Sequence, residues 1–325
     1  MEIPDISVVV IARNEEDSIG HCLASLVRVT EDMRAEILFV DSASTDRTVE
    51  VARSYPVRIA GLNPGSPLSP SAGRWVGTGL SGGKYIFYVD GDMIVLDHWL
   101  PRAIELLADP ALGGVGGRLF WVTPGDPITL EHKDDLPMGR VPGLGGGAVY
   151  KRKALDDCGG FNPFLRGEEE RELAYRLKRG GYGVMRVDVP MAVHLDKPRS
   201  IEENLERSTY FTGVGQIMRR HPLRSGFWDL VIEHREVYVA WFTVAFFSFV
   251  TILLAVSGHA RLFLLWVASG VLGTALLAAL KGPRRFWLYV HARYLLAVCF
   301  VQGIRRGLPS PDRFPGGFTW IKKEV

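Results

Sequence analysis

Residues 84–92 read KYIFYVDGD, and this stretch decides the fold that the sequence predicts. The run 84–89 is a mostly apolar strand, and the turn Asp-Gly-Asp at 90–92 ends it. Two similar runs precede it, ISVVVI at 6–11 and EILFV at 36–40, and each leads through polar residues into a helical pattern. Strands that are apolar along their whole length and alternate with helices predict a parallel sheet that is covered on both faces.

Polar side chains follow these strands at the points where the strands end. They are Asn14 and Glu15 after the first strand, Asp41 after the second, and Asp90 and Asp92 after the third. Ligands of such sheets bind at the carboxyl ends of the strands, so we expect these side chains to surround one ligand. Two carboxylates one residue apart can reach a divalent cation and a ribose, and Mg²⁺ and Mn²⁺ prefer oxygen ligands. An Asp-Gly-Asp sequence alone is more often a plain turn, and the buried strand before it favours the site.

The composition excludes several classes of protein. The 325 residues carry 38 Lys and Arg against 36 Asp and Glu, whereas a nucleic-acid-binding protein needs a basic excess. We therefore expect no nucleic-acid partner. The glycine clusters at 113–117 and 143–147 do not complete a GxGxxG motif, and the residues around Gly83 and Lys84 do not form a P-loop. The three scattered cysteines predict neither a disulfide framework nor a zinc site.

The slightly positive mean hydropathy of +0.10 comes from the C-terminal part of the chain. Residues 237–260 and 262–280 contain no Asp, Glu, Lys or Arg. Because a membrane-spanning helix needs about 20 apolar residues, we predict a transmembrane helical hairpin with spans at about 237–257 and 262–280. Two buried helices of a soluble core are the alternative, although soluble helices rarely run this long without a charge.

A third apolar run, 286–304, contains His291, Arg293 and Gln302, and we interpret it as a helix at the membrane interface. A third span is the alternative. Basic residues flank the predicted hairpin on both outer sides, so the positive-inside rule predicts that the N-terminal region and the C-terminal tail are cytoplasmic. The first residues show no signal-peptide pattern. We therefore predict a multi-pass protein of the cell membrane.

Five motifs stand in the order of one known family. They are VVVIARNEE at 8–16, EILFVDSASTD at 36–46, SAGRW at 71–75, YVDGD at 88–92 and GEEERELAYRL at 167–177. As an ordered set they resemble the family 2 glycosyltransferases of the GT-A fold, over residues 5–200. The resemblance implies an α/β fold with a Rossmann-like mixed sheet flanked by helices. The chain departs from the family's pattern where Ser42 replaces Asp, Trp75 replaces Asn and Glu170 replaces the catalytic Asp.

The apolar runs and the resemblance together predict a division of the chain. Residues 1–225 are expected to form a cytoplasmic glycosyltransferase domain, 226–285 a juxtamembrane helix with the hairpin, and 286–325 the interface helix and a cytoplasmic tail. The segment QIMRR at 216–220 is similar to the QxxRW acceptor motif of processive polysaccharide synthases. We favour the alternative that it is a basic helix that meets lipid head groups.

The resemblance implies a site for a nucleotide-diphospho-sugar donor. Its expected residues are Ala12, Asn14 and Glu15 around the nucleoside, Asp41 on the base, Arg74 at the diphosphate, and Asp90 with Gly91 at the ribose. Asp92 is expected to hold Mn²⁺ or Mg²⁺. His194 follows a predicted strand at 184–189, where some family members place a metal-binding His, although a lone His is more often structural.

The catalytic residues implied by the resemblance are Glu169 and Glu170, of which Glu170 holds the position of the base. Glutamates in a first helical turn also suit the helix dipole, which is the purely structural alternative. The implied reaction is an inverting displacement, in which the acceptor hydroxyl attacks the anomeric carbon and Glu170 takes its proton. A cation and Arg74 would stabilise the departing diphosphate.

Two classes of acceptor fit this reaction. A polyprenyl phosphate is already anionic and needs little help from a base, whereas a hydroxyl group needs it. The run DGDMI at 90–94 lacks the Gln of the DADLQ run of dolichyl-phosphate-mannose-type synthases. We therefore expect a hydroxyl acceptor on a lipid-linked glycan or glycolipid at the membrane. A catalytically degenerate nucleotide-sugar-binding module is the remaining alternative.

Overall fold

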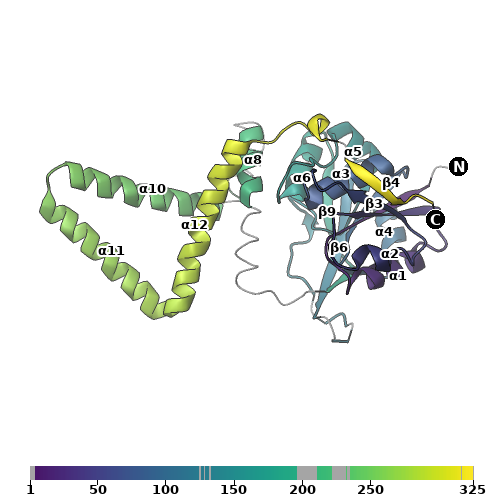
Figure 1. Ribbon diagram of the computed structural model, residues 1–325, viewed down its shortest axis with the longest axis horizontal. Coiled ribbons are helices and arrows are strands. Elements are labelled where there is room, and N and C mark those ends of the chain that lie inside the picture. Colours follow the sequence, from purple (N-terminus) through teal and green to yellow (C-terminus); the bar gives the residue numbers. More distant parts are fainter. Residues whose placement is uncertain are drawn as a thin grey trace. The chain divides into compact units, whose positions relative to one another are not determined.

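The computed structural model describes residues 4–123, 126–127, 129–131, 133–195, 211–221, 232, 235–315 and 317–324 (Figure 1). Its contacts divide the chain into two units. Unit 1 comprises Met1–Pro198 and Pro309–Val325, and unit 2 comprises Arg199–Leu308. This division differs from the predicted boundaries at 225 and 285, because the last residues return to the first unit instead of forming a separate tail.

Unit 1 is built on one mixed sheet. Its strands are β1 (Ile6–Ala12), β2 (Ala35–Asp41), β3 (Arg58–Leu62), β4 (Tyr85–Asp90), β5 (Met93–Val95), β6 (Leu112–Val122), β7 (Gly139–Arg140), β8 (Ala148–Lys151), β9 (Gly183–Leu195) and β10 (Phe318–Lys322). They follow the order β10-β3-β2-β1-β4-β8-β6-β9-β5, with β7 beside β9. The first four strands are parallel, and β8 runs antiparallel between β4 and β6. The predicted mixed α/β sheet is confirmed.

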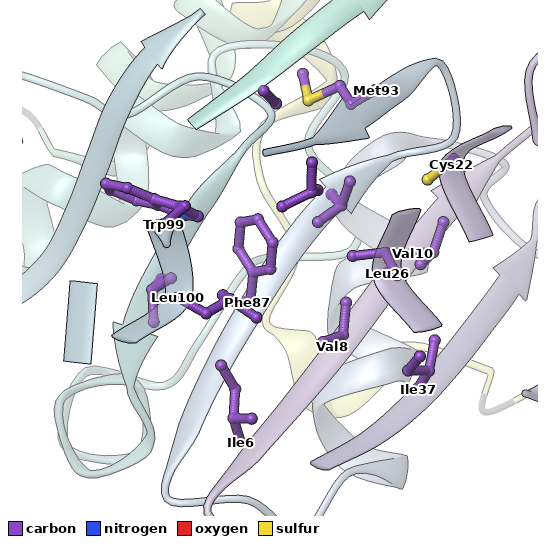
Figure 2. Close-up of a cluster of buried hydrophobic side chains, with 14 of the residues drawn as sticks. Ile6, Val8, Val10, Cys22, Leu26, Ile37, Phe87, Met93, Trp99 and Leu100 are labelled. Carbon is purple, nitrogen blue, oxygen red and sulfur yellow. The ribbon is translucent and has the colours of Figure 1, made fainter. Parts of the chain in front are cut away.

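Helices cover both faces of this sheet, as predicted. They are α1 (Ile19–Val29), α2 (Thr48–Ala52), α3 (Pro70–Leu80), α4 (Trp99–Leu106), α5 (Arg152–Cys158) and α6 (Glu169–Arg179). Alternate residues of β1 enter two separate cores. Val8 and Val10 pack with Phe87 beneath α1 and α4 (Figure 2), whereas Val9 and Ile11 pack beneath α3 on the opposite face. This double burial explains why the strand is apolar along its whole length.

Unit 2 contains the helices α8 (Phe211–Arg220), α10 (Arg235–Val256), α11 (Ala260–Lys281) and α12 (Pro283–Arg306). In α8 and α12, two glycines allow a close approach of the backbones. A Cβ atom on Gly215 would lie 2.2 Å from the Phe300 carbonyl oxygen, and one on Gly303 would lie 2.1 Å from the Thr212 carbonyl oxygen. Only glycine fits at these two positions.

The QIMRR segment lies in α8 and binds the end of α12. Gln216 Nε2 donates to the Gly307 carbonyl oxygen (2.9 Å), and Arg219 donates to the carbonyl oxygens of Ile304 and Arg305 (2.7 and 2.8 Å). These carbonyl groups have no partner within a helix at its C-terminal end. The two polar side chains therefore cap α12, a use that neither the acceptor-motif nor the head-group interpretation predicted.

The predicted hairpin corresponds to α10 and α11, and both segments are helical. In the part of the chain that the structure describes, no helix has both the length and the apolar run that a membrane crossing requires. The predicted spans at 237–257 and 262–280, and the alternative third span at 286–304, are therefore not supported. Both predicted spans include positions that lie outside the described side chains.

Candidate functional site

The donor residues predicted from the strand ends meet at one edge of the sheet. Ala12 lies opposite Asp41 in the parallel register of β1 and β2. Hydrogen bonds join the two loops that follow: the Asn14 N–H donates to Ser44 Oγ (3.0 Å), and the Thr45 N–H donates to Asn14 Oδ1 (2.8 Å). Asn14 has a φ of 57°, in the left-handed region that Asn tolerates better than most residues. The turn after β1 is thus locked against the turn after β2.

Asp41 is a buried carboxylate with an available acceptor atom. Its side chain Oδ2 accepts the Ser44 N–H (3.0 Å), whereas Oδ1 is buried and has no hydrogen-bond partner among the described residues. Buried acceptors are normally satisfied, so Oδ1 is suited to an N–H group of a ligand. Glu15 is held beside this loop, because its N–H donates to Thr48 Oγ1 (2.7 Å) and its carboxylate accepts the Ser18 hydroxyl (2.8 Å).

The Asp-Gly-Asp turn is fitted closely to the end of β1. Asp90 is paired with Ile11, and the Gly91 N–H donates to the Ile11 carbonyl oxygen (2.9 Å). A Cβ atom on Gly91 would lie 2.6 Å from the Ala12 Cβ, so only glycine fits between the strands. The turn therefore brings both of its carboxylates to the same edge as Ala12.

Asp92 and His194 form a pair beside this turn. His194 lies within β9, not after a strand as predicted, and it is opposite Met93 in the antiparallel pairing with β5. The Asp92 Oδ2 and His194 Nε2 atoms are 3.3 Å apart. The Trp121 ring, whose centroid is 4.4 Å from that of His194, packs against the imidazole. The structure thus brings the two predicted metal ligands together.

The ligand atoms of Asp92 and His194 suit a cation that binds together with the substrate of the protein. Among the described residues, no group of three or more His, Cys, Asp or Glu side chains converges on a metal position. A protein-bound Mg²⁺ typically uses one or two carboxylates and completes its coordination with substrate phosphates and water. Asp92 supplies such a carboxylate, and His194 adds an imidazole nitrogen beside it. Two ligands do not make a closed structural site, which needs about four protein ligands.

Arg74 lies under the site and is bound by three carboxylates. Its side chain is 2% exposed, and its guanidinium nitrogens lie 2.9 Å from Asp90 Oδ1, 2.9 Å from Glu169 Oε1 and 2.9 Å from Glu170 Oε1. Burial opposes its charge, but the carboxylates of Glu170, Asp90 and Glu169 outweigh burial and raise the pKa of Arg74. The residue predicted at the diphosphate therefore joins the Asp-Gly-Asp turn to the start of α6.

The two glutamates that begin α6 differ in environment. The turn before them uses left-handed conformations at Gly167 and Glu168, with φ of 102° and 61°. Glu169 is buried, and burial together with the neighbouring charge of Glu170 raises its pKa to about 8. The Glu170 side chain is 19% exposed. The raised pKa favours the protonated form of Glu169, and Glu170 is the more exposed member of the pair.

One glycine at the site was not singled out in the sequence. A Cβ atom on Gly146 would lie 1.8 Å from Asp90 Oδ2, so Gly146 lies directly against the Asp-Gly-Asp turn. Only glycine permits this close approach. The signal that could have indicated it is the glycine cluster at 143–147, although its spacing does not complete the GxGxxG motif of dinucleotide-binding proteins.

Comparisons with known proteins identify the family and the fold of the chain. Residues 7–170 match the family model described as Glycosyl transferase family 2. The chain is 27% identical over 138 residues to the glycosyltransferase AglE of Haloferax volcanii, covering 41% of this chain and 45% of that protein. It is 32% identical over 165 residues to the glucosyl-3-phosphoglycerate synthase of Mycolicibacterium paratuberculosis, covering 49% and 48%. The chain thus spans less than half the length of both relatives.

Among solved structures, the fold is similar to that of the mannosyltransferase PcManGT from Pyrobaculum calidifontis in complex with GDP-Man and Mn²⁺. The TM-score is 0.60 at 20% identity, and the match covers 93% of this chain and 88% of that one. At this identity the comparison establishes the fold alone.

Proposed function

The chain belongs to glycosyl transferase family 2 and is a glycosyltransferase, and we propose that it transfers a sugar from a nucleotide-diphospho-sugar to a hydroxyl acceptor with inversion at the anomeric carbon. One observation carries this proposal. A single edge of the sheet holds a buried carboxylate acceptor at Asp41, the pair Asp92–His194, and the glutamate Glu170 at the start of α6. In this order, the three parts serve to recognise the nucleotide, to bind the diphosphate and to deprotonate the acceptor.

Asp41 recognises the base of the nucleotide. Its buried Oδ1 atom accepts an N–H group from the base, and this contact fixes the nucleoside between the loops after β1 and β2. Uracil and guanine both present such an N–H, so Asp41 does not select between them. Asp90 and Gly91 lie beside Ala12 at the position of the ribose.

Asp92 and His194 hold the Mn²⁺ or Mg²⁺ ion that binds with the donor. When bound, such an ion neutralises the negative charge of the diphosphate leaving group. Arg74 does not take this part, because it is 2% exposed and binds three carboxylates. We assign it to the support of the site instead of to the diphosphate.

Glu170 is the general base. The acceptor oxygen forms a bond to the anomeric carbon as the bond to the diphosphate breaks on the opposite face, and the hydroxyl proton passes to the Glu170 carboxylate. The neighbouring Glu169 is less suited to this role, since it is buried and its raised pKa favours its protonated form. A polyprenyl phosphate acceptor remains the second candidate, because it would react without such a base.

The acceptor is lipid-linked, and the protein acts at a cell membrane with its transferase unit in the cytoplasm. This proposal is supported by the large apolar side chains that α10 and α11 expose, among them Phe242, Phe249, Leu264 and Leu272, which are all more than half exposed. Soluble monomers rarely expose large apolar patches.

The test is nucleotide diphosphate release by the purified full-length chain, with a panel of nucleotide-sugars and a membrane lipid extract as acceptor. We expect turnover by the wild type with Mn²⁺ or Mg²⁺, loss in Asp92→Asn, and loss in Glu170→Gln without loss of donor binding. Full activity of Asp92→Asn would contradict the metal site. Full activity of Glu170→Gln would favour the anionic acceptor, and donor binding without turnover of any sugar would favour a binding module.

A further inference from the structure

The tail Pro309–Val325 follows unit 2 in the sequence but belongs to unit 1, and it contacts the rest of unit 1 at several points. β10 pairs antiparallel with β3 at the edge of the sheet, with Phe318 opposite Leu62 (Figure 1). Before this strand, the buried side chain of Phe314 contacts two aromatic rings, with centroid distances of 5.0 Å to Trp75 and 5.9 Å to Phe164. The tail thereby reaches both α3 and the turn at 162–165, which precedes α6 in the sequence and is separate from the Gly167–Glu168 turn.

Asn162 connects this turn to the tail. Its side chain is buried and uses both ends of its amide: Nδ2 donates to the Pro309 carbonyl oxygen (3.0 Å), and Oδ1 accepts the Phe164 N–H (3.1 Å). Its own carbonyl oxygen accepts the Ser71 hydroxyl of α3 (2.6 Å). One residue therefore ties the tail, α3 and the turn before α6 to each other.

The same helix α3 also holds the start of α6. Ser71 binds the turn, and Arg74, one helical turn further on, binds Glu169 and Glu170. The turn and the carboxylates are thus fixed to one rigid element. A displacement of the turn at Asn162 would move the Glu170 carboxylate relative to Arg74. A misplacement of about 1 Å at a reacting group costs about a hundredfold in rate.

We infer that Asn162 is a positioning residue, which holds the start of α6 against the tail at Pro309 so that Glu170 meets the acceptor hydroxyl. The inference rests on the proposed role of Glu170 as the base. It extends the functional unit beyond the part of the chain that matches the family, because the carbonyl group that Asn162 binds lies at the far end of the sequence.

The test compares two substitutions of Asn162 in the full-length chain. Asn162→Asp keeps an oxygen for the Phe164 N–H but loses the donor to Pro309, and Asn162→Ala loses both bonds. We expect both to lower kcat about 10- to 100-fold while the donor KM and donor binding stay near the wild-type values. The control is Thr319→Val, which removes a hydrogen bond of the same tail to Asn63 away from the turn and should leave kcat unchanged.

Wild-type kcat in either folded Asn162 variant would overturn the inference, and so would a parallel loss of kcat, donor binding and thermal stability. If neither variant folds, Phe314→Leu decides, because it loosens the tail and leaves Asn162 intact. We expect a lower kcat with unchanged donor binding, and wild-type kcat would overturn the inference. Glu170→Gln separates the two proposals. Full activity of Glu170→Gln would contradict the proposal that Glu170 is the base. If Glu170→Gln is inactive while the Asn162 and Phe314 variants keep wild-type kcat, only the positioning role of Asn162 is contradicted.

Discussion

Arg74 shares one positive charge among Asp90, Glu169 and Glu170, and burial makes this arrangement sensitive to substitution. Three ionised carboxylates around one guanidinium would leave a buried excess of negative charge, which is costly in a medium of low polarity. The raised pKa of Glu169 relieves this excess, because the protonated glutamate is neutral and still accepts a hydrogen bond from Arg74. Two of the predictions concern this cluster.

The first prediction is that Arg74→Met lowers the free energy of unfolding by about 3–5 kcal/mol, since it leaves buried carboxylates without their partner. Arg74→Lys should lower the free energy of unfolding by less, because it keeps the positive charge. It still loses part of the stability, because an ammonium group does not reproduce the planar guanidinium that contacts Asp90 and the two glutamates through different nitrogens. Urea unfolding followed by tryptophan fluorescence measures both. The control is Arg47→Met, which removes only an exposed ion pair with Glu50 and should cost less than about 0.5 kcal/mol. Equal losses in Arg74→Met and Arg47→Met would contradict the buried cluster.

The second prediction concerns pH. The pKa of Glu169 is about 8 in the folded chain against its usual 4.5, so the folded state holds an extra proton between these values. The free energy of unfolding should therefore fall as the pH rises through this window, with a limiting slope of about 1.4 kcal/mol per pH unit. Below the usual pKa this stabilisation is fully present, and above the raised pKa it is lost.

Glu169→Gln imitates the protonated residue and should flatten this slope. Stability curves of the wild type and the variant, measured by denaturant unfolding from pH 5 to pH 9, provide the comparison. The curves should diverge most at the alkaline end, where the variant is the more stable protein. Parallel curves would show that Glu169 titrates near its usual pKa.

Among the elements, α8 and α12 give the sharpest test of packing. Their backbones approach so closely at Gly215 that even a methyl group would strike the Phe300 carbonyl oxygen. The third prediction is that Gly215→Ala destabilises this pair of helices by about 1–3 kcal/mol, measured as faster hydrogen exchange of their backbone amides. Gly273→Ala is the matched control in α11, because nothing lies within 4 Å of its added Cβ. It should leave exchange unchanged or slow it, and equal effects of both substitutions would contradict the close crossing.

The elements also mark how far the sequence could predict the site. The apolar runs that become β1, β2 and β4 identified the strand ends that carry Asp41 and Asp90. The local sequence pattern determines both where such a strand lies and where it ends. β9 was harder, because the sequence predicted a strand only at 184–189. In the structure the register shifts beside Pro190, and the strand continues to His194. A proline without an N–H is tolerated at such an irregularity, and the sequence alone does not reveal the pairing partner that permits it.

At the scale of the whole molecule, the local sequence pattern could not predict where the C-terminal tail packs. Residues 318–322 come after the long helix α12 in the sequence and form a strand of only five residues. No local signal connects them to β3, which lies more than 250 residues earlier in the chain. Arg74 illustrates the same limit at a single position: the family motif placed it at the site, but its three partners come from two other segments, the Asp-Gly-Asp turn and the start of α6. Contacts between distant segments depend on the assembled core, and they decide what supports the site.

The fourth prediction concerns the surface that unit 2 presents. α10 and α11 expose side chains such as Phe249 and Leu264 at 65% and 64%, and removing one side chain of this size from water is worth about 1.5–3 kcal/mol. If these helices associate with a bilayer, the full-length chain floats with lipid vesicles in a density gradient. Phe249→Glu and Leu264→Glu together should reduce the floating fraction, because a carboxylate resists transfer into the apolar layer. Leu136→Glu, an equally drastic change at an exposed apolar residue of unit 1, should leave flotation unchanged. Equal losses in the double variant and in Leu136→Glu would show that flotation reflects nonspecific hydrophobic adsorption. No loss in either variant would contradict a role of α10 and α11 at the membrane.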